Sequence, residues 1–189
     1  MSTLKKIAII IIALVCVQCA KENHYLIEKG KVGNINNQTK ILDLESIFNK
    51  DSIVSTSQKT DTIQEQKLFS VDSGEYLIYS KEGKKMLEIV PEKANDSSSK
   101  IRSIQIFDSN YITDRGISLT STFKDINENY MVNNVETTLT SATLFIDELN
   151  ATIAIDKKEL GLNNFSRDEV TLDQIPDLAK IKYFTIWFN

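Results

Sequence analysis

The sequence predicts an α+β protein built from two tandem repeats, each with one helix packed on an antiparallel sheet of about four strands. Three observations lead to this prediction. Apolar residues recur with helical spacing at two places about 80 residues apart, segments of alternating polarity follow each of them, and similar segments occur in the same order in both halves.

The two helices are expected at residues 41–48 and 123–130. Their apolar residues share one spacing, which places them on one helical face: Ile41, Leu44 and Phe48, and then Phe123, Ile126 and Tyr130. Thr122 and Asp125 form the capping pattern that starts the second helix. Lys40 occupies the equivalent position before the first helix, so the cap is not repeated there.

Segments of period-two alternation predict the strands of both sheets. The turn KEGK joins the first expected hairpin, and Glu148 to Asn150 join the second. The extended segments, including one short segment before each helix, are residues 25–30, 75–80, 85–90, 101–107, 111–116, 142–147, 151–156 and 181–187. A sheet with a helix on one face leaves its other face to solvent, to the other repeat or to a partner.

The first residues have the layout of a secretory signal. Lys5 and Lys6 precede an uncharged apolar run at 7–17, which is too short to span a bilayer stably. Cys19 stands where this run gives way to polar residues. The layout resembles a bacterial lipoprotein signal, which implies that Cys19 is acylated and becomes the first mature residue. Cys16 is the alternative acceptor, and both cysteines could instead belong to a discarded peptide or a membrane anchor.

These patterns divide the chain of 189 residues into four parts. We expect a lipoprotein signal peptide at 1–18, a tether with the first strand at 19–30, the first repeat at 31–108 and the second repeat at 109–189. No cysteine follows Cys19, so the fold must be stabilised by its own core without disulfides.

Composition disfavours several classes of function. The chain carries 22 basic and 26 acidic residues and no run of Lys or Arg, so nucleic acid is not an expected partner. The only histidine, His24, is expected in the tether, which leaves the folded body without a Ser–His or Cys–His pair. No glycine-rich phosphate loop or histidine-based metal set occurs. We therefore expect no catalytic residue, no metal and no cofactor.

The two closing strands differ in a way that indicates a binding surface. The strand at 101–107 is mostly polar on one face, where the strand at 181–187 carries Tyr183 and Trp187. Tyrosine and tryptophan are favoured at interfaces. Together with Tyr76 and Tyr79, these residues form the candidate binding surface. In the alternative interpretation, the aromatics pack the sheets of the two repeats against each other.

Several short motifs resemble those of bacterial lipoproteins. TDRGISLTST (113–122) resembles the approach to the first helix in small envelope lipoproteins of the SmpA/OmlA type, which share the β-lactamase-inhibitor-protein-like fold, and EKGKVGNINNQT (28–39) is a weaker copy. CAKEN (19–23) is similar to the signal after the cysteine in surface-exported flavobacterial lipoproteins. DSI (51–53) and DTI (61–63) are similar to the O-glycosylation pattern of that phylum. The resemblance implies an uncharacterised lipoprotein with a duplicated module of this fold.

These observations lead to a functional hypothesis. We expect a non-catalytic protein of the bacterial cell envelope, with the membrane as a partner through its lipid anchor and another envelope protein as a partner through the open sheet face. The alternative is a carboxylate-based hydrolase or a carbohydrate-binding protein of the envelope, with two acids facing each other in a cleft between the repeats. A purely structural spacer is a third interpretation.

Overall fold

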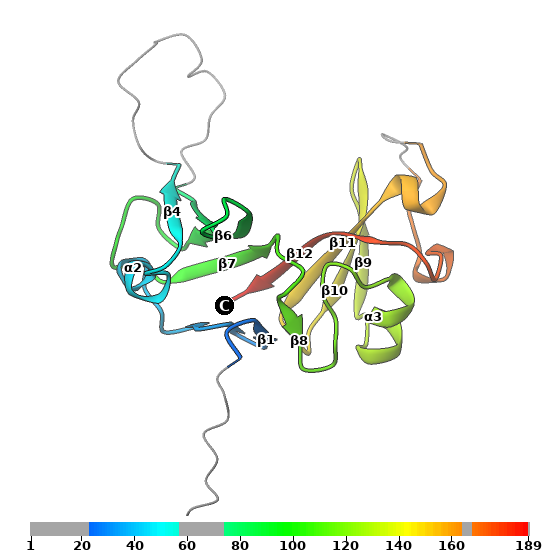
Figure 1. Cartoon of the computed structure of the whole chain (residues 1–189). Coiled ribbons are helices and arrows are strands. Elements are labelled where there is room, and N and C mark those ends of the chain that lie inside the picture. Colours follow the sequence, from blue (N-terminus) through cyan, green and yellow to red (C-terminus); the bar gives the residue numbers. More distant parts are fainter. Residues whose placement is uncertain (1–22, 57–73, 164–167, 189) are drawn as a thin grey trace, which may run out of the picture.

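The computed structural model describes residues 23–56, 74–163 and 168–188 (Figure 1). The strands are β1 (Leu26–Glu28), β2 (Lys31–Val32), β3 (Ile35–Asn36), β4 (Ser52–Ser55), β5 (Tyr76–Tyr79), β6 (Lys85–Pro91), β7 (Ile101–Ile106), β8 (Ile112–Thr113), β9 (Asn134–Thr137), β10 (Ser141–Ile146), β11 (Ala151–Asp156) and β12 (Ile181–Trp187). The helical segments are the α-helices α2 (Leu44–Ile47) and α3 (Phe123–Asn129) and the 3-10 turns η1 (Ile41–Asp43), η2 (Lys157–Leu160) and η3 (Leu172–Gln174).

The strands form two sheets. The smaller sheet has the order β3-β2-β1-β8, and the larger has the order β4-β5-β6-β7-β12-β11-β10-β9. All neighbours in the larger sheet are antiparallel, whereas β8 joins the smaller sheet parallel to β1. The predicted signal peptide and Cys19 lie outside the described residues, among which no helix is long and apolar enough to cross a membrane.

The predicted fold class, an α+β protein of two tandem helix-on-sheet repeats, is wrong. The protein is mostly β, because the strands expected in two separate sheets form one continuous sheet and four short strands add a second one. The physical reason lies in β7 and β12, which were expected to close separate sheets. Each has a free edge of backbone N–H and C=O groups, and these edges pair with each other, with Ile106 opposite Phe184 and Ile104 opposite Ile186.

The two expected helices have different outcomes. The helix at 123–130 is confirmed as α3, where the Thr122 hydroxyl accepts a hydrogen bond from the Asp125 N–H and the Asp125 carboxylate accepts one from the Thr122 N–H at 2.7 Å. The segment at 41–48 forms only the 3-10 turn η1 and the single helical turn α2. Without a threonine at position 40, the cap consists of the Lys40 N–H donating to the Asp43 carboxylate at 2.8 Å.

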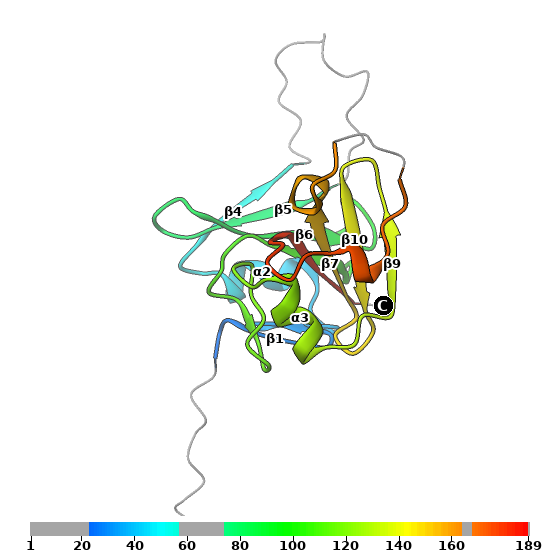
Figure 2. The same ribbon diagram turned by 90° about the vertical axis from the view of Figure 1, so that its right-hand side faces the viewer.

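One cluster of buried apolar side chains holds the layers together. Figures 1 and 2 show β1, α2 and α3 on the same side of the eight-stranded sheet, and that side of the sheet supplies most of the core. The fully buried residues of this sheet face include Ile78, Leu87, Ile89, Ile104, Ile106, Ala142, Leu144, Ile146, Ile153, Ile155, Phe184 and Ile186. Ile27, Val32, Ile35, Leu44 and Ile126 are buried in the same cluster from the opposite layer.

The smaller sheet ties the start of the described chain to its middle. Its parallel β1–β8 pair places Tyr25 next to Tyr111, whose rings meet edge to face with centroids 5.1 Å apart. Gly33, after β2, has a φ of +57°, and a Cβ atom there would stand 2.3 Å from the His24 carbonyl oxygen. Only glycine fits this crossing without moving the backbone.

Candidate functional site

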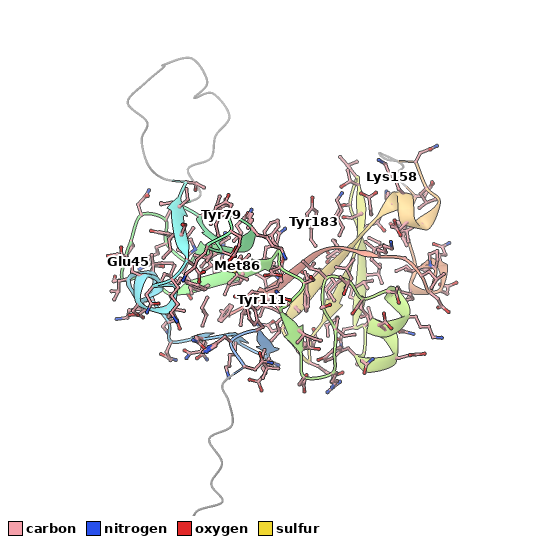
Figure 3. All side chains as sticks on the ribbon, in the orientation of Figure 1. Glu45, Tyr79, Met86, Tyr111, Lys158 and Tyr183 are labelled. Carbon is pink, nitrogen blue, oxygen red and sulfur yellow. The ribbon has the colours of Figure 1, made fainter. Side chains whose placement is uncertain are left out.

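The eight-stranded sheet has one face covered by α2, α3 and the smaller sheet, and no helix or strand among the described residues covers its other face, which we call the open face. Along each strand, the neighbours of the core residues point away from α2, α3 and the smaller sheet. The strand register places one row of such side chains across six strands: Leu77, Glu88, Gln105, Thr185, Thr152 and Phe145. All six are half-buried, so this face is neither part of the core nor fully solvated. Figure 3 shows Tyr183 on the open side of the sheet and Tyr111 on the covered side.

β12 places two of the predicted aromatic residues on the open face. Tyr183 and Trp187 flank Thr185 at even spacing and so point to the same side. Tyr183 is 44% exposed, and the Lys182 ammonium lies 5.3 Å from its ring centroid. The Trp187 indole is half-buried, and its Nε1–H donates to Thr152 Oγ1 at 3.1 Å. Tyr183 is therefore the accessible member of the pair, and Trp187 is fixed by the sheet.

A bulge in β6 adds a second group to the open face. The register shifts before Tyr79, which pairs with Lys85, so that Lys85 and Glu88 share a face although they are three residues apart. Lys85 Nζ lies 2.7 Å from Glu88 Oε2 and 3.7 Å from the centroid of the Phe107 ring. We call the open-face aromatics the aromatic face: Tyr79, Phe107, Phe145, Tyr183 and Trp187.

Tyr76 does not belong to this face. It pairs with the fully buried Ile89 and packs partly buried against the core, while Tyr79 points the other way. Residues three apart in a regular strand always point to opposite faces. The structure therefore brings Tyr79, Tyr183 and Trp187 to one surface and separates Tyr76 from them.

Sequence reasoning did not include Phe107 and Phe145 in the candidate surface. The signal that identifies Phe145 is simple alternation, because it stands between the buried Leu144 and Ile146 of β10. In the alternative interpretation the aromatics lie between two sheets. The aromatics of both halves instead lie in one sheet, and the smaller sheet belongs to the core on the covered side.

His24 lies within the fold and not in a tether outside it. Its Nδ1 is 3.0 Å from Asn34 Oδ1, and it lines a cavity together with Tyr25 and Tyr111. The expectation that the only histidine stands apart from the folded body is therefore wrong. The reason is the short turn at residues 24–25, which leads directly into β1 and passes over Gly33.

Hydrogen-bond donors surround the perturbed carboxylates. The Lys182 ammonium at 2.8 Å and the Lys158 N–H hold the pKa of Asp156 below its ordinary value. The Met131 N–H and the Arg115 guanidinium do the same for the pKa of Glu148. In the described part of the chain every carboxyl group with a shifted pKa is shifted downward, and no three His, Cys, Asp or Glu side chains converge to hold a metal ion.

Asp108 is a buried carboxylate that fixes the chain between β7 and β8. Burial alone raises its pKa, but the Lys84 ammonium at 2.7 Å and the Asn110 N–H outweigh burial and hold the pKa below its ordinary value. The Asp108 carbonyl also accepts a hydrogen bond from the Tyr111 N–H. This contact therefore helps to place both Phe107 on the open side and Tyr111 on the covered side.

Comparison with known proteins gives a likeness of fold. No known family and no curated protein matches the chain. Among solved structures, the crystal structure of the uncharacterized protein yfeY from Escherichia coli is similar, with a TM-score of 0.52 and 11% identity, covering 85% of this chain and 98% of that one. At 11% identity this similarity shows the fold alone.

The Asp108 contact predicts a stability that depends on pH. Because the pKa is lower in the folded state, the contribution is complete above the unfolded value of about 3.9 and is lost as the pH falls through the folded value. We expect the free energy of unfolding in urea to fall between about pH 5 and pH 2 more steeply in the wild type than in Asp108→Asn. Equal slopes would show that the carboxylate does not contribute.

Two substitutions on β12 distinguish accessible from structural aromatics. Tyr183→Ala is expected to change the free energy of unfolding by less than about 0.5 kcal/mol, because Tyr183 is a surface residue, 44% exposed. Trp187→Ala is expected to cost roughly 2 kcal/mol, from lost packing and the lost bond to Thr152. Urea unfolding measures both. A loss for Tyr183→Ala as large as that for Trp187→Ala would make the whole face structural.

Proposed function

We propose that this protein is a non-catalytic, lipid-anchored protein of the bacterial cell envelope that binds another protein through the aromatic face. The observation that carries the proposal is the arrangement of the eight-stranded sheet, which is covered on one side and carries five aromatic rings on the other. Tyrosine and tryptophan provide large contact areas at little cost in side-chain entropy.

The charges beside the rings support a protein partner over a charged ligand. Lys85 and Lys182, the cations nearest to the rings of the aromatic face, are each bound to an acid of the same sheet, Glu88 and Asp156. Such internally paired charges leave little net charge on the face. A surface of half-buried aromatics with paired charges matches the composition of a transient protein interface.

The geometry of the proposed anchor is consistent with this role. Leu26 follows Cys19 by seven positions, over which a fully extended chain spans at most about 25 Å. β1 belongs to the smaller sheet, on the covered side of the larger one. The described chain therefore starts on the side of the larger sheet opposite the aromatic face, so an anchor before it leaves that face accessible to a partner protein.

The environments of the acids favour binding over the carboxylate-based hydrolase. A general acid needs a carboxyl group whose pKa is raised, whereas the donors around Glu148, Asp156 and Asp108 keep these groups ionised. The carbohydrate-binding alternative does not need a protonated acid, so the lowered pKa of these carboxyl groups does not argue against it.

The anchor is tested by metabolic labelling with a palmitate analogue in cells. We expect label in the wild type and in Cys16→Ser, and a loss of label with release from the membrane fraction in Cys19→Ser. The two variants are matched because both remove one thiol from the same short segment. Label that persists in Cys19→Ser and disappears in Cys16→Ser would move the anchor to Cys16.

The interface is tested by placing a photo-crosslinking amino acid at Tyr183 in intact cells. Leu42 in η1 is a suitable control position, because it is 55% exposed and lies in a covering element on the other side of the sheet. We expect one discrete protein adduct at position 183 and none at 42. The purified partner should bind the Tyr183→Ala variant at least about tenfold more weakly. Unchanged binding would refute the aromatic face as the interface.

A further inference from the structure

The covered side of the molecule contains a cavity that the aromatic face does not involve. It has a volume of about 730 Å³, within the range of roughly 300–1,000 Å³ that is typical of ligand sites. Three segments surround it: the start of the smaller sheet, the turn from α2 into β4, and the turn between β5 and β6. The lining residues that matter here are Tyr25, Asn34, Asn49, Asp51, Met86 and Tyr111.

The wall of the cavity contains a buried hydroxyl group with no hydrogen-bond partner among the described residues. Tyr111 is only 3% exposed, and its hydroxyl forms no hydrogen bond with any residue that the structure describes. The Tyr130 hydroxyl, also buried, donates to Asp114 at 2.9 Å. Buried polar groups in proteins are almost always paired, so an unpaired one in the wall of a cavity indicates that something else satisfies it. Figure 3 shows Tyr111 next to Met86 on the covered side of the sheet.

The walls combine apolar surface with neutral polar groups. Phe48 and Met86 supply buried apolar surface, and the Tyr25 ring is 39% exposed at the rim. His24, Asn34, Asn49, Ser46 and Ser80 add hydrogen-bonding groups. The charged residues of the lining are two lysines and two acids, Lys50, Lys81, Asp51 and Glu82. The cavity therefore has many donors and acceptors but no excess of either charge.

The neighbouring hydroxyls already have other partners. The Ser46 hydroxyl donates to the Asp43 carbonyl at 2.9 Å, the Ser80 hydroxyl accepts from the Glu82 N–H, and His24 contacts Asn34. No described hydrogen bond joins either serine to the histidine. This arrangement positions groups for recognition and does not activate a nucleophile.

We propose that this cavity binds a neutral saccharide, a short oligosaccharide without carboxylate, phosphate or sulfate groups. Sugar rings present an apolar C–H face and a rim of hydroxyls, which match an aromatic ring beside amide and hydroxyl side chains. The balanced charge of the lining disfavours anionic ligands, and the polar rim disfavours an acyl chain. Tyr25 stacks on the sugar ring, and Tyr111 supplies the hydrogen bond that its hydroxyl lacks in the free protein. The inference is independent of the proposed protein interface.

Calorimetric titration of the full chain with maltotriose, cellotriose and chitotriose tests this proposal. If the chain is lipid-bound, it is kept in a detergent that has no sugar headgroup. We expect at least one of the three to bind with a Kd below about 1 mM, and Tyr25→Ala to abolish that binding. Tyr111→Phe, which removes only the hydroxyl, is expected to weaken binding about tenfold, as the loss of one hydrogen bond would. Tyr183→Ala, on the opposite face, should bind like the wild type.

The melting temperature of the same Tyr111→Phe variant distinguishes a ligand-binding role of the Tyr111 hydroxyl from a structural role. Because the Tyr111 hydroxyl has no hydrogen bond to a described residue, the variant is expected to melt at the same temperature as the wild type or above it. The proposal is overturned if none of the three trisaccharides binds the folded protein, if the variant binds as tightly as the wild type, or if it melts at a lower temperature. None of these three outcomes affects the crosslinking test of the protein interface at Tyr183.

Discussion

The antiparallel pairing of β7 with β12 is the contact on which the rest of the structure depends. Four residues at its centre, Ile104, Ile106, Phe184 and Ile186, are directly opposite one another and completely buried. Outward from this pair the sheet continues through β6, β5 and β4 on one side and through β11, β10 and β9 on the other. Because the pair makes one sheet, it also makes one core face and one open face for the whole molecule.

How much of this fold the sequence predicts depends on how far apart in the sequence the interacting residues are. α3 and both hairpins depend on local signals, namely the Thr122–Asp125 cap and period-two alternation, and the structure has them where these signals indicate. The joining of β7 to β12 depends on backbone edges far apart in sequence, which carry no side-chain signature. The weak helix at 41–48 has the apolar spacing of α3 but lacks its cap. Spacing alone did not suffice for a helix there.

The same distinction applies to the candidate surface. Tyr183 and Trp187 are on one face because they are separated by an even number of residues within one regular strand, and this could be read from the sequence. Lys85 shares that face with Glu88 only because of a bulge in β6, for which the residue types give no signal. The prediction that Tyr76 belongs to the same surface as Tyr79 was wrong, and alternation within β5 was enough to separate the two residues.

The larger sheet gives its two sides unlike chemistry. The open side carries rings whose neighbouring lysines are already paired, whereas the covered side contains a polar cavity with a buried tyrosine hydroxyl that has no described partner. An unpaired buried hydroxyl lowers stability. Tyr111 belongs to the buried core cluster and also lines the cavity, so a ligand of the proposed kind would supply the partner that its hydroxyl lacks among the described residues.

The position of β12 also determines how the chain reaches its native state. β7 has an unpaired edge until β12 pairs with it, and β8, α3, β9, β10 and β11 lie between these two strands in the sequence. Closure of the sheet is therefore a long-range event that carries a large loop-closure entropy. Until β12 is in place, the edge of β7 is open to pairing with a second unfolded chain.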